Sequence, residues 1–296
     1  DANSTSFNVE SSNVSVTGNT DGDLTASGAV TEPIALPTTV TTTGAAVNIF
    51  DFTLTDGGTS DGLSMDISQI VINVTGTTND ADRAKVTWRL NGNDASNVTG
   101  TYSAGADTIT FSGLTISVAD GASEVYTVNA YYNDNTGLTE GQTFILSVDG
   151  DTDVTSSGGT TMGATSAINN STGTTVDVTA TQLVFSAQPS ASVATSVNMG
   201  VVTLQAQDAA GNVDTGFTEV ITLTDENQGG ETDGAGALAT TSNGTSLAVA
   251  ATAGQVSWAN LTYNAIAAIN IDANSTSFNV ESSNVSVTGN TDGDLT

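Results

Sequence analysis

Acidic turns are the part of this sequence best suited to chemistry. In three places, residues 21–23, their copy 292–294 and residues 149–153, aspartates alternate with glycine or threonine in a short run. Hard cations such as Ca²⁺ take roughly six to eight oxygen ligands, and such turns gather carboxylate and carbonyl oxygens without bulky side chains. No run has the spacing of an EF-hand loop. We expect calcium, as the single cofactor, at Asp21 and Asp23 and at Asp149, Asp151 and Asp153; weaker acidic clusters are Asn79, Asp80 and Asp82, and Asp225, Glu226, Glu231 and Asp233.

Catalytic chemistry is poorly supported by the composition. The chain has no histidine and no cysteine, which excludes Ser-His and Cys-His nucleophiles, His or thiolate metal sites, and disulfides. A carboxylate pair for glycoside hydrolysis is formally available. Among 32 acidic residues, however, such pairs arise from composition alone. We therefore expect the protein not to be an enzyme.

The charge balance restricts the partners. Three basic residues stand against 32 acidic ones, for a net charge of −29. Nucleic acid is excluded as a partner because phosphate binding needs clustered Lys and Arg, and an anionic membrane surface is unsuitable for the same reason. No run reaches the roughly 18 apolar residues of a membrane span, so this segment is not expected to insert into a membrane.

Glycans are a further class of partner to consider. Asn-x-Ser/Thr sequons recur along the chain, as expected for a sequence rich in Asn, Ser and Thr. Two of them are expected in exposed loops, where a glycan would be accepted: Asn97 and Asn243.

Two-residue periodicity dominates the rest of the chain and predicts β-strands. Phe50, Phe52 and Leu54 alternate with polar residues, and Arg83 and Lys85 are expected to point outward beside an inward Ala84. The pattern predicts an all-β protein with two antiparallel β-sandwiches, each with roughly seven or eight short strands. The further residues expected to face inward are Ile70, Ile72, Val74, Val86, Trp88, Leu90, Phe111, Tyr126, Val128, Ala130, Phe144, Leu146, Val148, Val202, Leu204, Ala206, Ile221, Leu223, Trp258, Ile269 and Ile271.

Several motifs carry a resemblance to a known family. Residues 182–189, 207–212 and 254–261 read QLVFSAQP, QDAAGN and GQVSWANL. They resemble the immunoglobulin-like tandem repeat modules of giant bacterial cell-surface and adhesin-like proteins. Residues 52–58, 85–92 and 110–114, which read FTLTDGG, KVTWRLNG and TFSGL, are similar to the module that often accompanies them. The resemblance implies Ig-like sandwiches that act as spacers, and no binding specificity.

A perfect duplication sets the organisation of the chain. Residues 272–296 repeat residues 1–25 without a change, so the period is 272 − 1 = 271 residues. Solenoid repeats are roughly 20 to 50 residues long, so each repeat here must contain whole domains. We expect a piece of a longer repeating protein divided as follows: 1–14, closing strand of the preceding repeat; 15–31, linker; 32–153, first sandwich; 154–180, linker; 181–285, second Ig-like sandwich; 286–296, start of the next linker.

The duplicated segment is expected to contain the closing strand of the second sandwich. A hairpin is predicted in which residues 269–273 run up and residues 276–280 return through Asn274 and Ser275. Residues 5–9 then form a second copy of that strand. Either successive repeats form one continuous chain, or separate chains exchange the strand; we favour the continuous chain. The inter-repeat strand residues are Thr5, Phe7 and Val9 and their copies Thr276, Phe278 and Val280.

These features predict a structural role. We expect a load-bearing spacer repeat of an extracellular filament or giant surface adhesin, located at the cell surface, with neighbouring copies of itself as partners. The alternative is a carbohydrate- or surface-binding β-sandwich module. Exposed aromatic rows would favour that alternative, but aromatic residues are only 5% of the chain and most are expected in the core.

Overall fold

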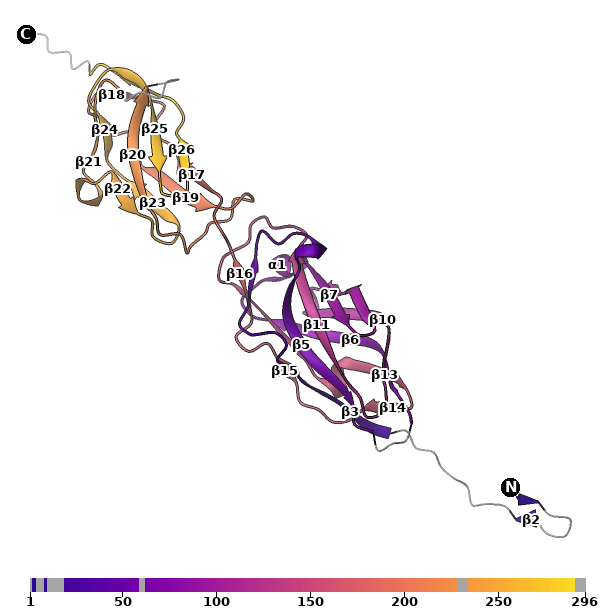
Figure 1. Ribbon diagram of the computed structural model, residues 1–296. Helices are drawn as coiled ribbons and strands as arrows, with labels where there is room; N and C mark the ends of the chain where they lie inside the picture. The colour runs from indigo at the N-terminus through magenta and orange to yellow at the C-terminus, as the bar shows by residue number, and fades with distance from the viewer. Residues whose placement is uncertain (1, 4–7, 10–18, 59–61, 228–233, 291–296) are drawn as a thin grey trace, which may run out of the picture. The chain divides into compact units, whose positions relative to one another are not determined.

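Residues 2–3, 8–9, 19–58, 62–227 and 234–290 are described by the computed structural model (Figure 1). They form an all-β protein with several sheets, an arrangement consistent with multiple β-sandwich domains. The chain divides into two compact units. Unit 1 comprises Asp1–Ile34, Ala46–Tyr131 and Phe144–Thr174, and unit 2 comprises Ala35–Ala45, Tyr132–Thr143 and Thr175–Thr296. The helical segments of the described residues are short: α1 (Asp80–Ala84), α2 (Gly150–Asp153), η1 (Thr43–Ala45) and η2 (Asn243–Thr245).

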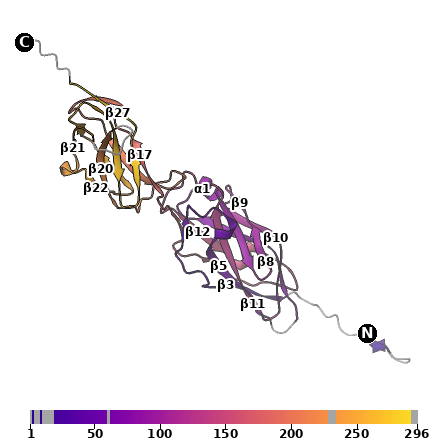
Figure 2. The same cartoon turned by 45° about the horizontal axis from the view of Figure 1, so that its top comes forward.

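Unit 1 contains a six-stranded sheet in which neighbouring strands come from distant parts of the sequence. Within it, β3 and β11 flank β5 on either side in antiparallel pairing, as both views show (Figure 1, Figure 2). In spatial order the strands are β14 (Thr160–Met162), β3 (Asn19–Ala26), β5 (Val47–Asp56), β11 (Ser123–Tyr132), β7 (Val86–Gly92) and β8 (Ala95–Thr99).

A second sheet of unit 1 is centred on one long strand. That strand, β6, pairs with several neighbours in antiparallel register, and its contact with β10 is interrupted by a bulge between Ser112 and Ile116. The strands are β12 (Thr143–Val148), β6 (Met65–Thr75), β10 (Thr108–Val118) and β9 (Thr101–Ser103) in spatial order, with β13 (Val154–Gly158) on β6 and β15 (Ile168–Asn169) on β12.

The core of unit 1 follows the predicted alternation. Phe50, Phe52 and Leu54 are buried, and the Trp88 and Phe144 rings meet edge to face with centroids 5.6 Å apart. Burying one large apolar side chain contributes about 1.5–3 kcal/mol. The strand prediction is therefore confirmed for these residues and for Ile70, Ile72, Val74, Val86, Leu90, Phe111, Tyr126, Val128, Ala130, Leu146 and Val148, all of which are buried.

The prediction was wrong at the start of β7. Arg83 is buried and Ala84 is exposed, the reverse of the expected faces. The strand pattern stops at Lys85 because the preceding residues form α1, whose N-cap Asn79 accepts a hydrogen bond from the Asp82 backbone N–H (3.0 Å). The buried Arg83 guanidinium pairs with Asp107 at 2.7 Å, so an ion pair replaces the expected apolar contact.

The structure places strands where the sequence pattern predicts linkers. Strand β3 lies within the expected linker 15–31, and β13 and β14 lie within the expected linker 154–180. Only Gly22 and Leu24 are buried in β3. At Gly22 an added β-carbon would come within 2.5 Å of the Met65 sulfur, so a glycine lets β3 approach β6 closely. Because β3 has only one buried apolar side chain, that of Leu24, its sequence shows no alternating hydrophobic pattern.

Unit 2 contains three antiparallel or mixed sheets around one core. Trp258, Tyr263 and Leu204 are fully buried there, and the Trp258 Nε1–H donates to the Ser246 carbonyl (3.1 Å). Strands β4 (Ala35–Pro37) and β16 (Thr174–Asp177) add a parallel pair. The sheets, in spatial order, are β17 (Gln182–Ala187), β19 (Val202–Gln207) and β23 (Gln255–Trp258); β18 (Ser192–Ala194), β27 (Val285–Thr288), β25 (Ala267–Asn274), β20 (Val220–Asn227) and β22 (Ala248–Ala250), with β26 (Asn279–Glu281) on β25; and β21 (Leu238–Thr240) with β24 (Leu261–Tyr263).

Candidate functional site

The second copy of the duplicated segment is built into a sheet of unit 2. It begins at Asp272, within β25, and continues through β26 and β27, which pair with successive parts of the same β25 edge. Its Ala273, Val285 and Val287 are buried, at 0%, 0% and 2% exposure. On its other side β27 runs parallel to β18. The duplicated residues therefore complete both a sheet and a core.

Between β26 and β27 the chain is held by hydrogen bonds that centre on Ser282. Its backbone N–H donates to the Ile271 carbonyl, and its hydroxyl accepts from the Ile271 N–H, both at 2.9 Å. The Asn270 Nδ2 donates to the Ser282 carbonyl at 2.9 Å. Ser282 is 5% exposed, so these buried bonds fix the junction of the two short strands on β25.

The hairpin turn is longer than the sequence pattern predicts. The return strand begins at Asn279, and Thr276 lies exposed in the turn. The Ser275 N–H donates to the Phe278 carbonyl (2.8 Å), and the Ser275 hydroxyl accepts from the Phe278 N–H (3.1 Å). From outside the duplicated segment, Glu219 accepts from the Ser277 N–H (2.9 Å), and the Phe217 ring lies 5.9 Å from that of Phe278. Phe278 and Val280 are half-buried against the core.

The described residues of the first copy make the same strand pairs. Strands β1 (Ala2–Asn3) and β2 (Asn8–Val9) make a two-stranded sheet with Ala2 opposite Val9 and Asn3 opposite Asn8. Adding the period of 271 residues gives the pairs of the second copy, Ala273 with Val280 and Asn274 with Asn279. Thr5 and Phe7 lie outside the described residues. One local sequence thus specifies one register in both places.

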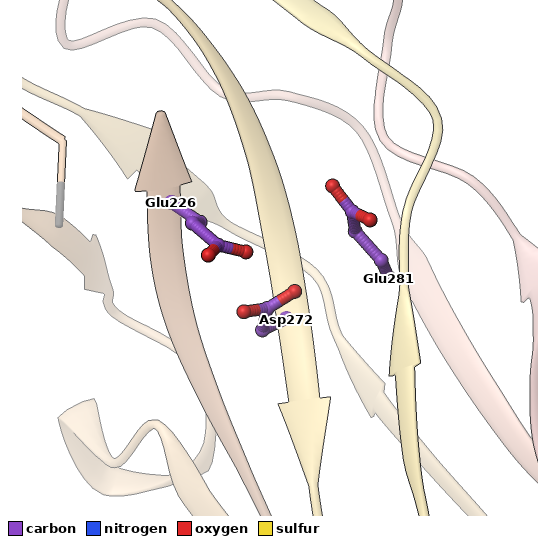
Figure 3. Close-up of side chains that lie close together, drawn as sticks. All are labelled: Glu226, Asp272 and Glu281. Atoms are coloured by element: carbon purple, nitrogen blue, oxygen red, sulfur yellow. The ribbon is translucent and has the colours of Figure 1, made fainter. Parts of the chain in front are cut away.

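Strand pairing also brings three acidic side chains together in unit 2. Glu226 on β20, Asp272 on β25 and Glu281 on β26 each place a carboxylate oxygen within 4.8 Å of the others (Figure 3). Asp272 and Glu281 are direct cross-strand partners, and like charges in that position repel each other. Asn270, two residues before Asp272 and on the same face of β25, has a buried Oδ1 without a hydrogen-bond partner among the described residues.

This acidic triad, Glu226, Asp272 and Glu281, could hold a hard divalent cation such as Ca²⁺, because carboxylate and amide oxygens are its preferred ligands. Sequence reasoning placed Glu226 in a weak acidic cluster and missed the other two. Their signal is the register of β25 and β26, which no linear motif records. Two of the three ligands belong to the duplicated segment, so a bound cation would tie the closing hairpin to β20.

The residues predicted from acidic turns are placed differently. Asp149 is the N-cap of α2 and Asp153 is its last residue, and the Asp153 Oδ2 accepts from the Asn73 side chain (2.8 Å) and from the Asp149 N–H (2.9 Å). The Asp149 Oδ1 accepts from the Thr165 hydroxyl (2.6 Å), and Asp151 is exposed. Burial raises the pKa of Asp153. These carboxylates accept hydrogen bonds around the turn, and calcium binding by them stays a prediction.

The Asp21-Gly22-Asp23 segment, which the sequence pattern predicts to be an acidic turn, lies within strand β3. Asp23 is exposed, whereas Asp21 is half-buried and its Oδ2 accepts from the Asn19 side chain (2.8 Å). Asn97 and Asn243 are exposed as predicted, with positive φ angles of 52° and 54°, but Asn97 lies in β8 and Asn243 in η2 instead of in loops. Glycosylation at either position stays a prediction.

The four aromatic side chains that the sequence pattern assigns to the core instead of to ligand stacking are buried. Trp88, Trp258, Phe111 and Tyr126 are at most 1% exposed, as their place in the apolar alternation predicts. Among the residues that the structure describes, the large hydrophobic side chains that are exposed are aliphatic: Leu63, Val125, Val197, Val201, Val220 and Ile266. No exposed aromatic row of the kind used to stack sugars is present among them.

Comparisons with known proteins give only distant structural likeness. No protein-family model and no curated protein matches the chain. It is similar to the zebrafish RET cadherin-like domains 1 to 4, with a TM-score of 0.28 and 13% identity over 91% of this chain and 52% of that one. It is also similar to the CupB6 tip adhesin from Pseudomonas aeruginosa, with a TM-score of 0.25 and 8% identity over 91% of this chain and 100% of that one. The chain thus spans about half the length of the RET structure.

The fold itself defines the class of this chain, which is an all-β protein divided into two compact units. Within the described part of the chain, no helix has the length and apolarity needed to cross a membrane.

Calcium is expected to protect the closing hairpin through the acidic triad. At a free Ca²⁺ concentration ten times the dissociation constant, binding to the folded state contributes about 1.4 kcal/mol. Amides of β25 and β26 should then exchange about tenfold more slowly, as measured by hydrogen-exchange mass spectrometry at constant ionic strength. The double variant Glu226→Gln/Glu281→Gln should lose this response, and Asp151→Asn, which removes an exposed carboxylate of unit 1, should keep it. Equal protection in both variants would assign the calcium effect to another site.

Proposed function

We propose that this chain is a non-catalytic structural repeat of an extracellular filament or giant surface adhesin. Its two units act as load-bearing Ig-like spacers, and its partners are neighbouring copies of the same repeat. The observation that carries the proposal is the duplicated segment. One copy completes the core and a sheet of unit 2, and the other begins unit 1 with the same strand pairs, Ala2 with Val9 and Asn3 with Asn8.

The duplication also suggests how successive repeats are joined. Strand β27 ends at Thr288, and Asn290 is the copy of Asn19, the first residue of β3. In a continuous tandem chain, one residue, Gly289, therefore separates the last strand of unit 2 from the first strand of the next unit 1. A connection this short leaves little freedom to the joint, whereas a long Gly/Ser linker would behave as a flexible coil. Load would pass from one sheet almost directly into the next.

The acidic composition fits an extracellular location. A net charge of −29 per chain makes parallel copies repel each other laterally, which favours separate, soluble fibres. At about 0.1 M salt, this repulsion is screened beyond roughly 10 Å. Salt or divalent cations would therefore control whether fibres bundle.

A denaturing gel of the native material tests the continuous chain. The protein would be taken from the producing cells, without proteolysis, and detected with an antibody against unit 2. We expect a band at a multiple of the repeat mass, far above the 29.6 kDa of this chain. A single species near the mass of one 271-residue unit, or a ladder whose lowest band has that mass, would contradict a continuous chain and favour separate subunits. Immunogold labelling of intact cells should mark extended surface structures, and exclusively internal labelling would contradict the location.

A further inference from the structure

The end of unit 2 at which the chain passes out of β27 carries an exposed apolar side chain, Ile266. It is 70% exposed, the largest value among the exposed large hydrophobic side chains of the described residues. Ile266 directly precedes β25, whose first residue, Ala267, pairs with Val287 of β27. Beyond the end of β27, a β-carbon at Gly289 would lie 3.5 Å from the Ile266 Cδ1. Ile266 therefore lies beside the residue that follows the last strand of the unit.

A second exposed aliphatic side chain, that of Val197, lies at the same end of unit 2. The Val197 N–H donates to the Ala194 carbonyl (3.1 Å), and Ala194 is the cross-strand partner of Thr288, the last residue of β27. Val197 is 44% exposed. Because β18 and β25 lie on opposite sides of β27, the end of this strand has an exposed aliphatic residue on each side, Val197 by β18 and Ile266 by β25.

The end of unit 1 at which β3 begins carries an exposed leucine. Asn19, the first residue of β3, donates its N–H to the Gly159 carbonyl (3.2 Å) and is the partner of Thr160 on β14. A β-carbon at Gly159 would come within 2.7 Å of the Leu63 side chain, so Leu63 packs over this backbone. Leu63 is nevertheless 38% exposed. The first strand of unit 1 therefore starts about 4.8 Å, one strand spacing, from the backbone that Leu63 covers.

The duplication brings these two ends together in a continuous tandem chain, so the inference rests on the proposed function. Asn290 is the copy of Asn19, and Gly289 precedes it. Consecutive Cα atoms are about 3.8 Å apart, so the residue next to Ile266 is joined directly to the first residue of the next β3. Single exposed aliphatic residues are normal on a protein surface. Among the described residues, however, three of the six exposed large hydrophobic side chains flank this one connection: Leu63, Val197 and Ile266.

We propose that Ile266 and Val197 of one repeat pack against Leu63 of the following repeat and form an apolar contact across the joint. The partner of this surface is thus a second copy of the chain, joined through Gly289. Short linkers give effective concentrations of about millimolar order, so a contact too weak to associate separate chains is populated within one chain. Gly289 limits the distance between successive repeats, and this contact fixes their relative orientation.

Cysteine cross-linking in a two-repeat chain tests the contact. The sequence has no cysteine, so any disulfide joins the introduced pair. Residues 1–271 followed by residues 1–296 are produced as one polypeptide, with Ile266→Cys in the first repeat and Leu63→Cys in the second. A disulfide needs Cα atoms about 4.4–6.8 Å apart. In oxidised glutathione, this pair should cross-link within one chain at least ~10-fold faster than Val220→Cys in the first repeat paired with Leu63→Cys in the second.

Val220 is a matched control because it is exposed and lies in the same sheet as β25 and β27, but at the other end. It is the first residue of β20, and the last residue, Asn227, is the one opposite Ile269 on β25. Val220 is therefore seven residues (227 − 220 = 7), or roughly 23 Å along the strand, from the end that carries Ile266.

Substitutions outside the cysteine pair show whether apolar packing causes the cross-link. Adding Val197→Asp to the first repeat should slow the reaction of the Ile266→Cys and Leu63→Cys pair at least ~5-fold, because it places a charge in the contact. Adding Val220→Asp, which introduces the same charge at the other end of the sheet, should change the rate less than ~2-fold. Hydrogen-exchange protection of β19 and β23 should be equal in both variants, which controls for the folding of unit 2.

Three outcomes would overturn the proposal. They are equal cross-linking rates for the Ile266 and Val220 pairs, equal effects of Val197→Asp and Val220→Asp, and cross-links that form only between separate two-repeat chains. Because the two repeats are joined by design, none of these outcomes depends on whether native repeats are continuous. The denaturing gel of the native material decides that question separately.

Discussion

Removal of residues 272–296 is expected to unfold unit 2 while unit 1 stays folded. The deletion takes away the buried Ala273, Val285 and Val287 and the part of β25 that pairs with β20 at Thr222 to Thr224. The two valines alone contribute about 3–6 kcal/mol of hydrophobic burial. A whole domain is stable by only about 5–15 kcal/mol. The deletion also removes the hydrogen bonds of β26 and β27 and the partner strand of β18. These further losses should exceed the free energy of unfolding that remains.

Each unit has its own buried tryptophan, which makes the effect separable. Trp88 reports on unit 1 and Trp258 on unit 2. We expect the deletion to expose Trp258 to quenchers and to abolish hydrogen-exchange protection in β19 and β23, with Trp88 and β5 unchanged. Deleting only residues 289–296, beyond the end of β27, should leave both units intact. Native-like protection of β19 and β23 in the longer deletion would show that the duplicated segment is dispensable.

The same deletion makes a sharper prediction about partners, because the truncated chain still carries the first copy. A chain of residues 1–271 has a vacated place on β25 and β20 and an identical segment at residues 1–25. Insertion of that segment from a second chain restores the same contacts, so residues 1–271 should associate head to tail in a concentration-dependent manner. A chain of residues 19–271 should stay monomeric, and a peptide of residues 272–296 should fold its unit 2.

Matched variants distinguish strand insertion from nonspecific association of an unfolded unit. A peptide carrying Val285→Asp should not restore protection, since Val285 is fully buried. Glu219→Gln, in the acceptor, should weaken peptide binding several-fold because Glu219 accepts the Ser277 N–H. Analytical ultracentrifugation and hydrogen exchange measure both effects. If residues 1–271 stay monomeric while the free peptide binds, the first copy is unable to reach a neighbour, which would strengthen the continuous-chain proposal.

The parts of the fold that could be predicted are those whose signal is local. Phe52, Trp88 and Leu204 lie on alternating patterns and are buried as expected, because apolar burial dominates folding and a strand repeats every two residues. The same alternation continues from Phe50, Phe52 and Leu54 to Asp56, which is also fully buried. The apolar part of this inward-facing series ends at Leu54, so hydrophobic periodicity alone does not predict that Asp56 is buried.

The parts that could not be predicted depend on tertiary pairing. Asp272 and Glu281 are ordinary strand residues until the register of β25 and β26 places them opposite each other. Arg83 is buried because Asp107, 24 residues away, supplies its ion pair. Strand β3 packs through Gly22, whose contribution is the absence of a side chain. None of these features changes the composition or periodicity of its own segment.

A buried polar network in unit 2 provides the second large expected effect. Asp208, 2% exposed, accepts hydrogen bonds from the Thr38 hydroxyl (2.7 Å), from the Asn212 side chain (2.8 Å) and from the N–H groups of Ala210 and Asn212 (both 2.9 Å). Asn212 in turn donates to the Asn135 carbonyl and accepts from the Leu138 N–H. One carboxylate therefore links three segments that lie far apart in the sequence.

Asp208→Ala should destabilise unit 2 by about 3 kcal/mol, because it leaves several buried donors without an acceptor. Thr38→Val, which removes one of those donors, should cost about 1 kcal/mol. The exposed Asp134→Asn, which removes the same charge from unit 2, should change stability by less than about 0.5 kcal/mol. Urea unfolding followed through Trp258 fluorescence measures all three. A cost for Asp208→Ala no larger than that for Asp134→Asn would mean that the network relaxes and water replaces the carboxylate.

The pH dependence of this effect has a definite sign. Burial alone would raise the pKa of Asp208, but the hydrogen bonds from Asn212 and Thr38 outweigh it and hold the pKa below the usual value. A carboxyl whose pKa is lowered by folding stabilises the folded state above its unfolded pKa, and this contribution is lost as the pH falls through the folded pKa. The difference in stability between the wild type and Asp208→Asn should therefore be constant above about pH 5 and shrink below about pH 4. Because other acids such as Asp177 have raised pKa values and act in the opposite direction, only this difference isolates Asp208. A difference that grows on acidification would require a raised pKa for Asp208. Folding would then disfavour the ionised form of this carboxylate.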